Sequence, residues 1–256
     1  MTIQELFDLR DQVAIVTGGG RGLGFAMAEA LAEAGASVVL ASRKLETVER
    51  AADALNRAGH RAMALKLDVS SPEDIDTVVH QTQQQWGRID ILINNSGATW
   101  GASALDMPLE AWLKVMRVNV DGTFFMSQRV ARVMRELGGG RIINIASVAG
   151  LMGTDPRAMD AVGYSTSKGA IIAMTRDLAF KWASYNIRVN AIAPGFIPTK
   201  MSQGLIEHHG DLLRANIPLT RFGTPDDVKG VALLLASRAS NYMTGAVLTV
   251  DGGVSA

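Results

Sequence analysis

Tyr164 and Lys168 are the side chains of this sequence whose types and spacing favour proton transfer. They lie near the start of an apolar-periodic run that continues to Trp182, and residues four apart on a helix share one face. A free tyrosine has a pKa of about 10, and a neighbouring ammonium favours the phenolate. We therefore expect Lys168 to lower the pKa of Tyr164 towards the range of a general acid or base. Ordinary amphipathic helices also carry this spacing, so the interpretation depends on the rest of the chain.

The elements that must position this pair are strands and helices that alternate along the chain. Apolar runs rich in Val, Ile and Leu predict strands at 13–16, 37–41, 62–67, 89–93, 141–145, 187–193 and 247–250. Residues 71–74 (Ser-Pro-Glu-Asp) and 224–227 (Thr-Pro-Asp-Asp) predict helix starts, because each combines a capping hydroxyl, a proline and acids. Strands that are apolar on both faces are typical of a parallel sheet covered by helices. We expect residues 1–256 to form a single doubly wound α/β domain with a mostly parallel, seven-stranded sheet and ligands beyond the carboxyl ends of the strands.

The composition excludes several classes of function. Lys plus Arg equals Asp plus Glu at 25 each, so no net charge attracts the chain to nucleic acid or to an acidic membrane. The absence of cysteine excludes disulfides, thiolate metal sites and a thiol nucleophile. The first twelve residues lack a signal-peptide core, and no apolar run approaches the ~18 residues that span a bilayer. We expect a cytoplasmic protein with no nucleic-acid or membrane partner.

A glycine cluster follows the first predicted strand with the spacing Gly18-x-x-x-Gly22-x-Gly24. A turn of this kind between a strand and a helix brings backbone N–H groups close to a phosphate. The spacing differs from the commoner G-x-G-x-x-G fingerprint, and glycines also mark plain tight turns. The position at the first strand-to-helix junction favours nucleotide binding.

Basic residues at the end of the second predicted strand indicate which dinucleotide would bind. An acid there would accept a hydrogen bond from the ribose of NAD, whereas this chain has Ser42, Arg43 and Lys44, with Arg21 in the glycine turn. The planar guanidinium of arginine suits a phosphate, so the pattern favours NADP (NADPH) over NAD. The alternative is that both arginines are solvated surface charges.

The motifs occur in the order Thr17-Gly18-x-x-x-Gly22-x-Gly24, Asn94-Asn95-Ser96-Gly97, Ser147, Tyr164-x-x-x-Lys168 and Pro194-Gly195. From Phe7 to Gly253 the chain resembles the compact, single-domain branch of the short-chain dehydrogenase/reductase family. The resemblance implies a Rossmann-type fold, a nicotinamide cofactor, a small ketone or secondary alcohol as substrate, and a homotetramer. No metal is required, and the adjacent His208 and His209 are interpreted as solvated side chains.

The resemblance also assigns roles to individual residues. Tyr164 matches the proton donor or acceptor, Lys168 the residue that lowers its pKa and binds the nicotinamide ribose, and Ser147 the hydroxyl that holds the substrate oxygen. Asn119 matches a residue that kinks a helix and supports a water relay. The implied cofactor contacts, besides Tyr164 and Lys168, are the pyrophosphate loop (Gly18, Arg21, Gly22, Leu23, Gly24), the ribose and adenine pocket (Ser42, Arg43, Asp68, Val69, Asn95, Gly97) and the nicotinamide side (Pro194, Gly195, Ile197, Thr199).

The chain departs from the family pattern at two places. Ser96 replaces the usual alanine of Asn-Asn-Ala-Gly, and the segment between Ser147 and Tyr164 is longer than in most close relatives, around 154–160. The longer loop and a substrate loop at 196–222 are expected to shape the pocket, so its form cannot be copied from relatives.

Two branches of the family resemble this chain, the 3-oxoacyl reductases and the sugar-acid dehydrogenases of the gluconate 5-dehydrogenase type. Where reductases of carrier-bound substrates have arginines, this chain has Phe180 and Tyr185, which disfavours a carrier. The candidate walls of the substrate pocket are Trp100, Met152, Met159 and Met201. Such walls would favour an apolar or amphiphilic ketone, although these side chains could equally cover the hydrophobic core. A different class also remains open, a non-catalytic nucleotide-binding regulator on the same fold.

Overall fold

A parallel sheet occupies the centre of the protein, whose computed structural model describes residues 1–157, 159–200 and 202–256. Its strands are β1 (Val13–Thr17), β2 (Ser37–Ser42), β3 (Arg61–Lys66), β4 (Ile91–Asn94), β5 (Gly140–Ile145), β6 (Ile187–Pro194) and β7 (Val247–Val250). They lie in the order β3-β2-β1-β4-β5-β6-β7, and every pairing is parallel. The chain therefore winds outwards from β1 to β3 and then returns to β4. Ligands bind at such a reversal, beyond the carboxyl ends of β1 and β4.

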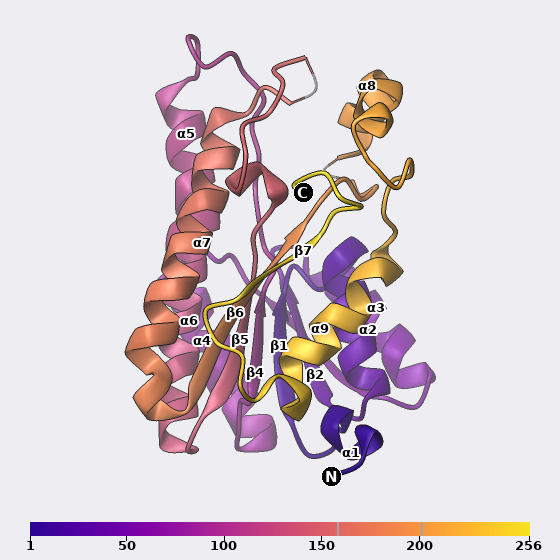
Figure 1. Ribbon diagram of the computed structural model, residues 1–256. Coiled ribbons are helices and arrows are strands. Elements are labelled where there is room, and N and C mark those ends of the chain that lie inside the picture. Colours follow the sequence, from indigo (N-terminus) through magenta and orange to yellow (C-terminus); the bar gives the residue numbers. More distant parts are fainter. Residues whose placement is uncertain (158, 201) are drawn as a thin grey trace.

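Helices cover both faces of this sheet (Figure 1). They are α1 (Ile3–Phe7), α2 (Gly22–Glu33), α3 (Leu45–Arg57), α4 (Pro72–Trp86), α5 (Leu109–Met116), α6 (Gly122–Glu136), α7 (Val162–Trp182), α8 (Gln203–Ala215) and α9 (Lys229–Ala236). One core cluster joins the sheet to α2, α3 and α9, and a second joins it to α4, α6 and α7. Within β1, Ala14 and Val16 belong to the first cluster and Ile15 to the second, because side chains alternate along a strand.

The predicted fold class is confirmed. The region 108–137, interpreted from its sequence as two helical stretches, contains α5 and α6, which the π-helical turn Arg117–Asp121 joins. Helices α1 and α8 were not expected from the sequence. Both predicted helix starts are present: the Ser71 hydroxyl accepts from the Asp74 N–H at 3.1 Å, and Thr224 forms a capping box before the short 3-10 helix Pro225–Val228 and α9. None of the described helices is long and apolar enough to cross a membrane.

Candidate active site

A cavity of about 1110 Å³ opens beyond the carboxyl ends of the strands. Eighteen of the predicted site residues line it: Gly18, Arg21, Gly22, Leu23, Gly24, Ser42, Arg43, Asp68, Val69, Asn95, Gly97, Ser147, Tyr164, Lys168, Pro194, Gly195, Ile197 and Thr199. Asn119 is fully buried and is not among the described residues that line the cavity. Residues from almost the whole length of the chain therefore meet at one site.

The glycine turn is held in place by side chains of β1 and β4. Gly18 has a positive φ of 65°, and a side chain on Gly24 would collide with the Gly18 carbonyl oxygen. The Asn95 amide donates to the carbonyls of Thr17 and Gly18 at 3.0 and 3.2 Å, and the Thr17 hydroxyl accepts from the Asn95 N–H at 3.0 Å. The turn is thus fixed tightly against α2, whose amino end offers free N–H groups to an anion.

Asp68 lines the part of the cavity where the adenosine of the cofactor was predicted to bind. Its carboxylate accepts from the Ser70 N–H at 3.0 Å and from the Ser70 hydroxyl at 2.6 Å. Burial raises the pKa of Asp68, but these hydrogen bonds and the nearby charges of Arg43 and Lys66 outweigh it, so the net shift is downwards. The carboxylate is therefore ionised and oriented. Arg43 also lines the cavity, so a guanidinium and this carboxylate share the predicted ribose and adenine pocket.

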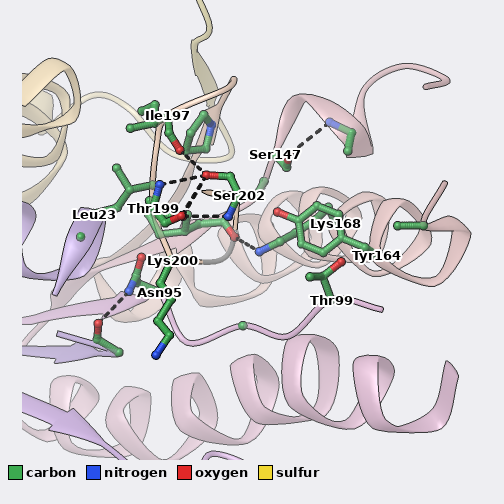
Figure 2. Close-up of a pocket in the computed structure, with 18 of the residues that line it drawn as sticks. Leu23, Asn95, Thr99, Ser147, Tyr164, Lys168, Ile197, Thr199, Lys200 and Ser202 are labelled. Atoms are coloured by element: carbon green, nitrogen blue, oxygen red, sulfur yellow. Dashed lines mark hydrogen bonds between the residues drawn. The ribbon is translucent and has the colours of Figure 1, made fainter. Parts of the chain in front are cut away.

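The cavity brings together the predicted catalytic residues Ser147, Tyr164 and Lys168 (Figure 2). Ser147 follows β5, and the other two come from the first turns of α7. The Lys168 ammonium lies 5.5 Å from the centroid of the Tyr164 ring, and its Nζ donates to the Ile145 carbonyl at 2.7 Å. A serine hydroxyl, a phenol and an ammonium thus share one small space.

The pKa values of this pair differ from the sequence-based expectation. Burial raises the pKa of Tyr164, and the hydrogen bond with Ser147 opposes this shift without reversing it. Burial also lowers the pKa of Lys168 to about 8, since an ammonium is poorly solvated there. The expected lowering of the Tyr164 pKa by Lys168 is therefore not found in this structure, because burial of the phenol is the larger influence on its pKa.

Asn119 lies in the π-helical turn between α5 and α6, where the family resemblance predicted a kink. Its amide accepts from the Ala98 N–H at 2.7 Å and donates to the Ala98 carbonyl at 2.9 Å and to the Ser167 hydroxyl at 2.8 Å. Ser167 in turn donates to the Tyr164 carbonyl at 2.7 Å. Asn119 therefore connects the loop after β4 to the helix of Tyr164. The water relay stays a prediction.

Comparisons with known proteins agree with this geometry. A family model described as enoyl-(acyl carrier protein) reductase matches residues 18–255. The chain belongs to the short-chain dehydrogenase/reductase family.

It is 41% identical to an NAD-dependent glycerol dehydrogenase of Listeria innocua, over 96% of this chain and 95% of the relative. It is 39% identical to a 3-oxoacyl-(acyl-carrier-protein) reductase of Aquifex aeolicus, over 96% and 98%. A gluconate 5-dehydrogenase of Burkholderia cenocepacia, solved with NADP and tartrate, has a TM-score of 0.93 and 34% identity over 99% and 98% of the two chains.

As a member of the short-chain dehydrogenase/reductase family, the chain is an oxidoreductase. Side chains from other segments complete the lining of the cavity. Of the predicted walls, Met152 and Met159 line it, whereas Trp100 is not among the described lining residues and Met201 lies outside the described part of the chain. Apolar lining also comes from Phe196 and Leu213.

The polar lining residues of this part of the cavity were not predicted individually, although most lie in the segments 154–160 and 196–222 that were expected to shape the pocket. They are Thr99, Thr154, Asp155, Asp160, Lys200, Ser202 and Asn216. These residues lie in loops and at the two positions that flank α8, where no periodic pattern marks them individually.

The two adjacent histidines lie on α8. The Nδ1 atom of His208 is 2.6 Å from the Gly204 carbonyl oxygen, and the two imidazole centroids are 6.4 Å apart. In the described parts of the chain, no three His, Asp or Glu side chains gather in a way that could hold a metal ion.

Proposed function

We propose that this protein transfers hydride between NADP(H) and a ketone or secondary alcohol, with Tyr164 as the general acid or base. The observation that carries the proposal is the convergence of Ser147, Tyr164 and Lys168 in the same cavity as the glycine turn. A nicotinamide dinucleotide fits the lining, because Gly18, Gly22 and Gly24 line the cavity at the amino end of α2 and Asp68 offers an oriented acceptor at the predicted adenosine end. We further propose that residues 1–256 act as one domain, with 196–222 as its substrate loop.

The residues divide the chemistry between them. When bound, the nicotinamide supplies or receives the hydride. As a ketone is reduced, its oxygen gains negative charge, which the Ser147 hydroxyl stabilises by donating a hydrogen bond. Tyr164 then gives that oxygen a proton, and its raised pKa keeps the phenol protonated at neutral pH. Lys168 orients the cofactor ribose beside them.

The preference for NADP rests on Arg21 and Arg43. Both line the cavity, and no acid replaces Ser42 at the end of β2. The gluconate 5-dehydrogenase solved with NADP supports this preference, while the NAD-dependent glycerol dehydrogenase does not. The two arginines therefore carry this part of the proposal.

The apolar lining of Met152, Met159, Phe196 and Leu213 supports a 3-oxoacyl-type or other small ketone, as in the acyl reductase relative. The surface argument against a carrier is weaker than the sequence indicated. Phe180 is 88% exposed, but the guanidinium of Arg135 lies 5.6 Å from the Tyr185 ring, so positive charge is present there.

A second candidate is a sugar acid. The hydroxyls of Thr99 and Thr154 line the cavity and would bond sugar hydroxyls, and the ammonium of Lys200 would pair with a carboxylate. The similarity to the gluconate 5-dehydrogenase supports this alternative.

The test is oxidation of NADPH and NADH over a panel of ketones, 3-oxoacyl thioesters and keto-sugar acids. Wild-type protein, Tyr164→Phe and Arg43→Asp are compared. We expect turnover with at least one class, a loss of at least about 10²-fold in kcat for Tyr164→Phe, and unchanged cofactor binding in that variant. Arg43→Asp should weaken NADPH and spare NADH.

Three results would contradict parts of the proposal. Full activity of Tyr164→Phe would remove the tyrosine from the chemistry. Equal losses of NADPH and NADH in Arg43→Asp would remove the basis for NADP preference. Cofactor binding without turnover on any substrate class would favour the non-catalytic regulator.

A further inference from the structure

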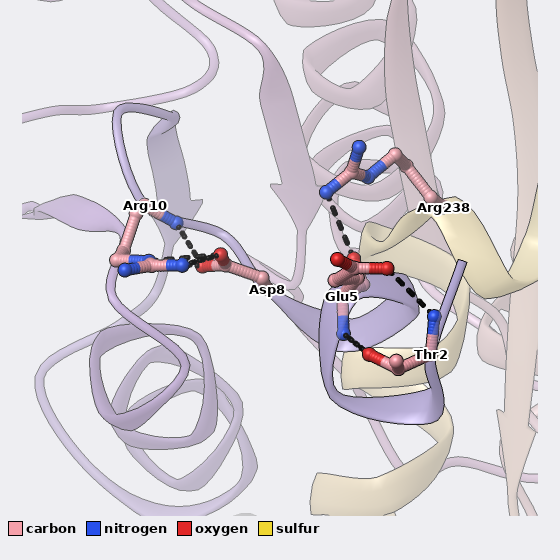
Figure 3. A network of polar contacts seen from close by, with 5 residues as sticks. All are labelled: Thr2, Glu5, Asp8, Arg10 and Arg238. Carbon is pink, nitrogen blue, oxygen red and sulfur yellow. Dashed lines mark hydrogen bonds and ion pairs between the residues drawn. The ribbon is translucent and has the colours of Figure 1, made fainter.

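Ser202 occupies the capping position before α8 but does not cap that helix. A serine at this position ordinarily accepts a hydrogen bond from an N–H of the first turn. Thr2, before α1, shows the ordinary arrangement: its hydroxyl accepts from the Glu5 N–H at 3.2 Å, and the Glu5 carboxylate accepts from the Thr2 N–H at 2.6 Å (Figure 3). The Ser202 hydroxyl therefore has a different task.

That hydroxyl turns back onto the preceding loop (Figure 2). It donates to the Ile197 carbonyl at 2.7 Å and accepts from the Thr199 N–H at 2.9 Å, and it lies 3.2 Å from the Thr199 hydroxyl. One side chain thus satisfies two backbone groups and contacts a third polar group. The cost is an uncapped amino end of α8.

The base of this loop is fixed by packing. The Ile197 side chain is buried, and a Cβ placed on Gly223 would lie 2.8 Å from its Cγ1 atom. Because Ile197 is buried and closely packed against Gly223, the hydrogen bonds of Ser202 connect Thr199 to a well-packed residue.

Thr199 in turn lies against the glycine turn. A Cβ placed on Gly22 would be 3.6 Å from the Cγ2 atom of Thr199. Thr199 therefore reaches the amino end of α2, where a helix binds the phosphates of a dinucleotide. A group held there in advance loses less entropy when the ligand binds.

We propose that Ser202 is a positioning residue that holds Thr199 over the amino end of α2 for the pyrophosphate and nicotinamide half of the cofactor. This inference rests on the proposed function. Without the Ser202 hydroxyl, the Thr199 N–H and the Ile197 carbonyl bond to water instead, and Thr199 samples several positions before the cofactor arrives. The adenosine half of the cofactor, bound near Asp68 and Arg43, does not depend on Ser202.

The experiment compares equilibrium binding of NADPH, NADH and adenosine 2′-phosphate, which lacks the pyrophosphate and the nicotinamide. The proteins are wild type, Ser202→Ala, Ser202→Thr and the remote capping variant Thr2→Ala. Ser202→Ala should bind both dinucleotides about five- to twenty-fold more weakly and adenosine 2′-phosphate with unchanged affinity. Ser202→Thr keeps the hydroxyl and should restore binding, and Thr2→Ala should bind all three probes like wild type.

Ser202→Cys is a second variant of nearly the same shape with a weakly bonding thiol, and it should show the same selective loss. Unchanged dinucleotide binding in Ser202→Ala would overturn the inference, and so would an equal loss for adenosine 2′-phosphate, which indicates general destabilisation. If wild-type protein binds neither dinucleotide, the proposed function itself fails, which is a separate result.

Discussion

Lys168 places an ammonium group in a poorly solvated site, with 5% of the residue exposed. Its pKa of about 8 is well below the ordinary lysine value of 10.5, because burial penalises the charged form. Between pH 8 and 10.5 the unfolded chain binds more protons at this residue than the folded chain does. The free energy of unfolding therefore gains a contribution that rises with pH over this window. Below pH 8 the charge is present in both states and the penalty is complete.

Replacing Lys168 with methionine should consequently stabilise the protein while abolishing turnover. At pH 7 we expect the free energy of unfolding to rise by about 1–3 kcal/mol, because the variant no longer buries an ammonium group. The gain is partly offset because the Ile145 carbonyl loses its hydrogen-bond donor. Thermal or urea unfolding of both proteins from pH 7 to 10.5 measures the difference, which should shrink as the pH rises. A difference that grows with pH would contradict the depressed lysine pKa.

The distance between Ser147 and Tyr164 depends on how the segment after β5 packs against α7. Ser147 is followed by a 3-10 turn, Val148–Gly150, that packs on the backbone of α7. A Cβ on Gly150 would lie 2.6 Å from the carbonyl carbon of Lys168 and 2.7 Å from the amide nitrogen of Gly169. No side chain fits there, so the glycine fixes the distance between the two elements.

Gly150→Ala should therefore move Ser147 away from Tyr164 without altering any group that lines the cavity. We expect kcat to fall about tenfold or more, since small displacements of reacting groups are costly, while adenosine 2′-phosphate binds normally. Steady-state kinetics measures this. Gly230→Ala is the matched control, because its Cβ would meet nothing within 4 Å and should leave kcat unchanged. Wild-type kcat in Gly150→Ala would show that the two elements can separate freely.

The sequence predicted the elements better than it predicted their environment. The strands were evident because apolar runs such as 13–16 are buried on both faces, and the glycine turn was evident from its place after β1. Helix α8 was missed because its residues, 203–215, were interpreted as part of the substrate loop 196–222. The pKa of Tyr164 was predicted in the wrong direction, since spacing shows proximity to Lys168 but not burial. The role of Ser202 depends on where its hydroxyl points, which no spacing contains.

The molecule as a whole has one helical layer with unusual apolar exposure. On the side formed by α5, α6 and α7, Leu113 is 50% exposed, Phe125 40% and Phe180 88% (Figure 1). Large exposed apolar groups on regular helices are typical of protein–protein contacts. The family resemblance also implied a tetramer, in part through this layer.

We therefore predict that the protein is a homotetramer in solution and that light scattering gives about four times the 27.3 kDa mass of the chain. Phe180→Asp should shift the population to smaller species, because burying an unpaired carboxylate at an interface is costly. Ile3→Asp is the control, since Ile3 is also exposed, at 66%, but lies on α1, away from this layer.

A wild-type monomer at working concentration would contradict the prediction. A tetramer that Phe180→Asp leaves intact would place the contacts elsewhere, such as along β7. The exposed apolar side chains of α5 to α7 would then need another explanation.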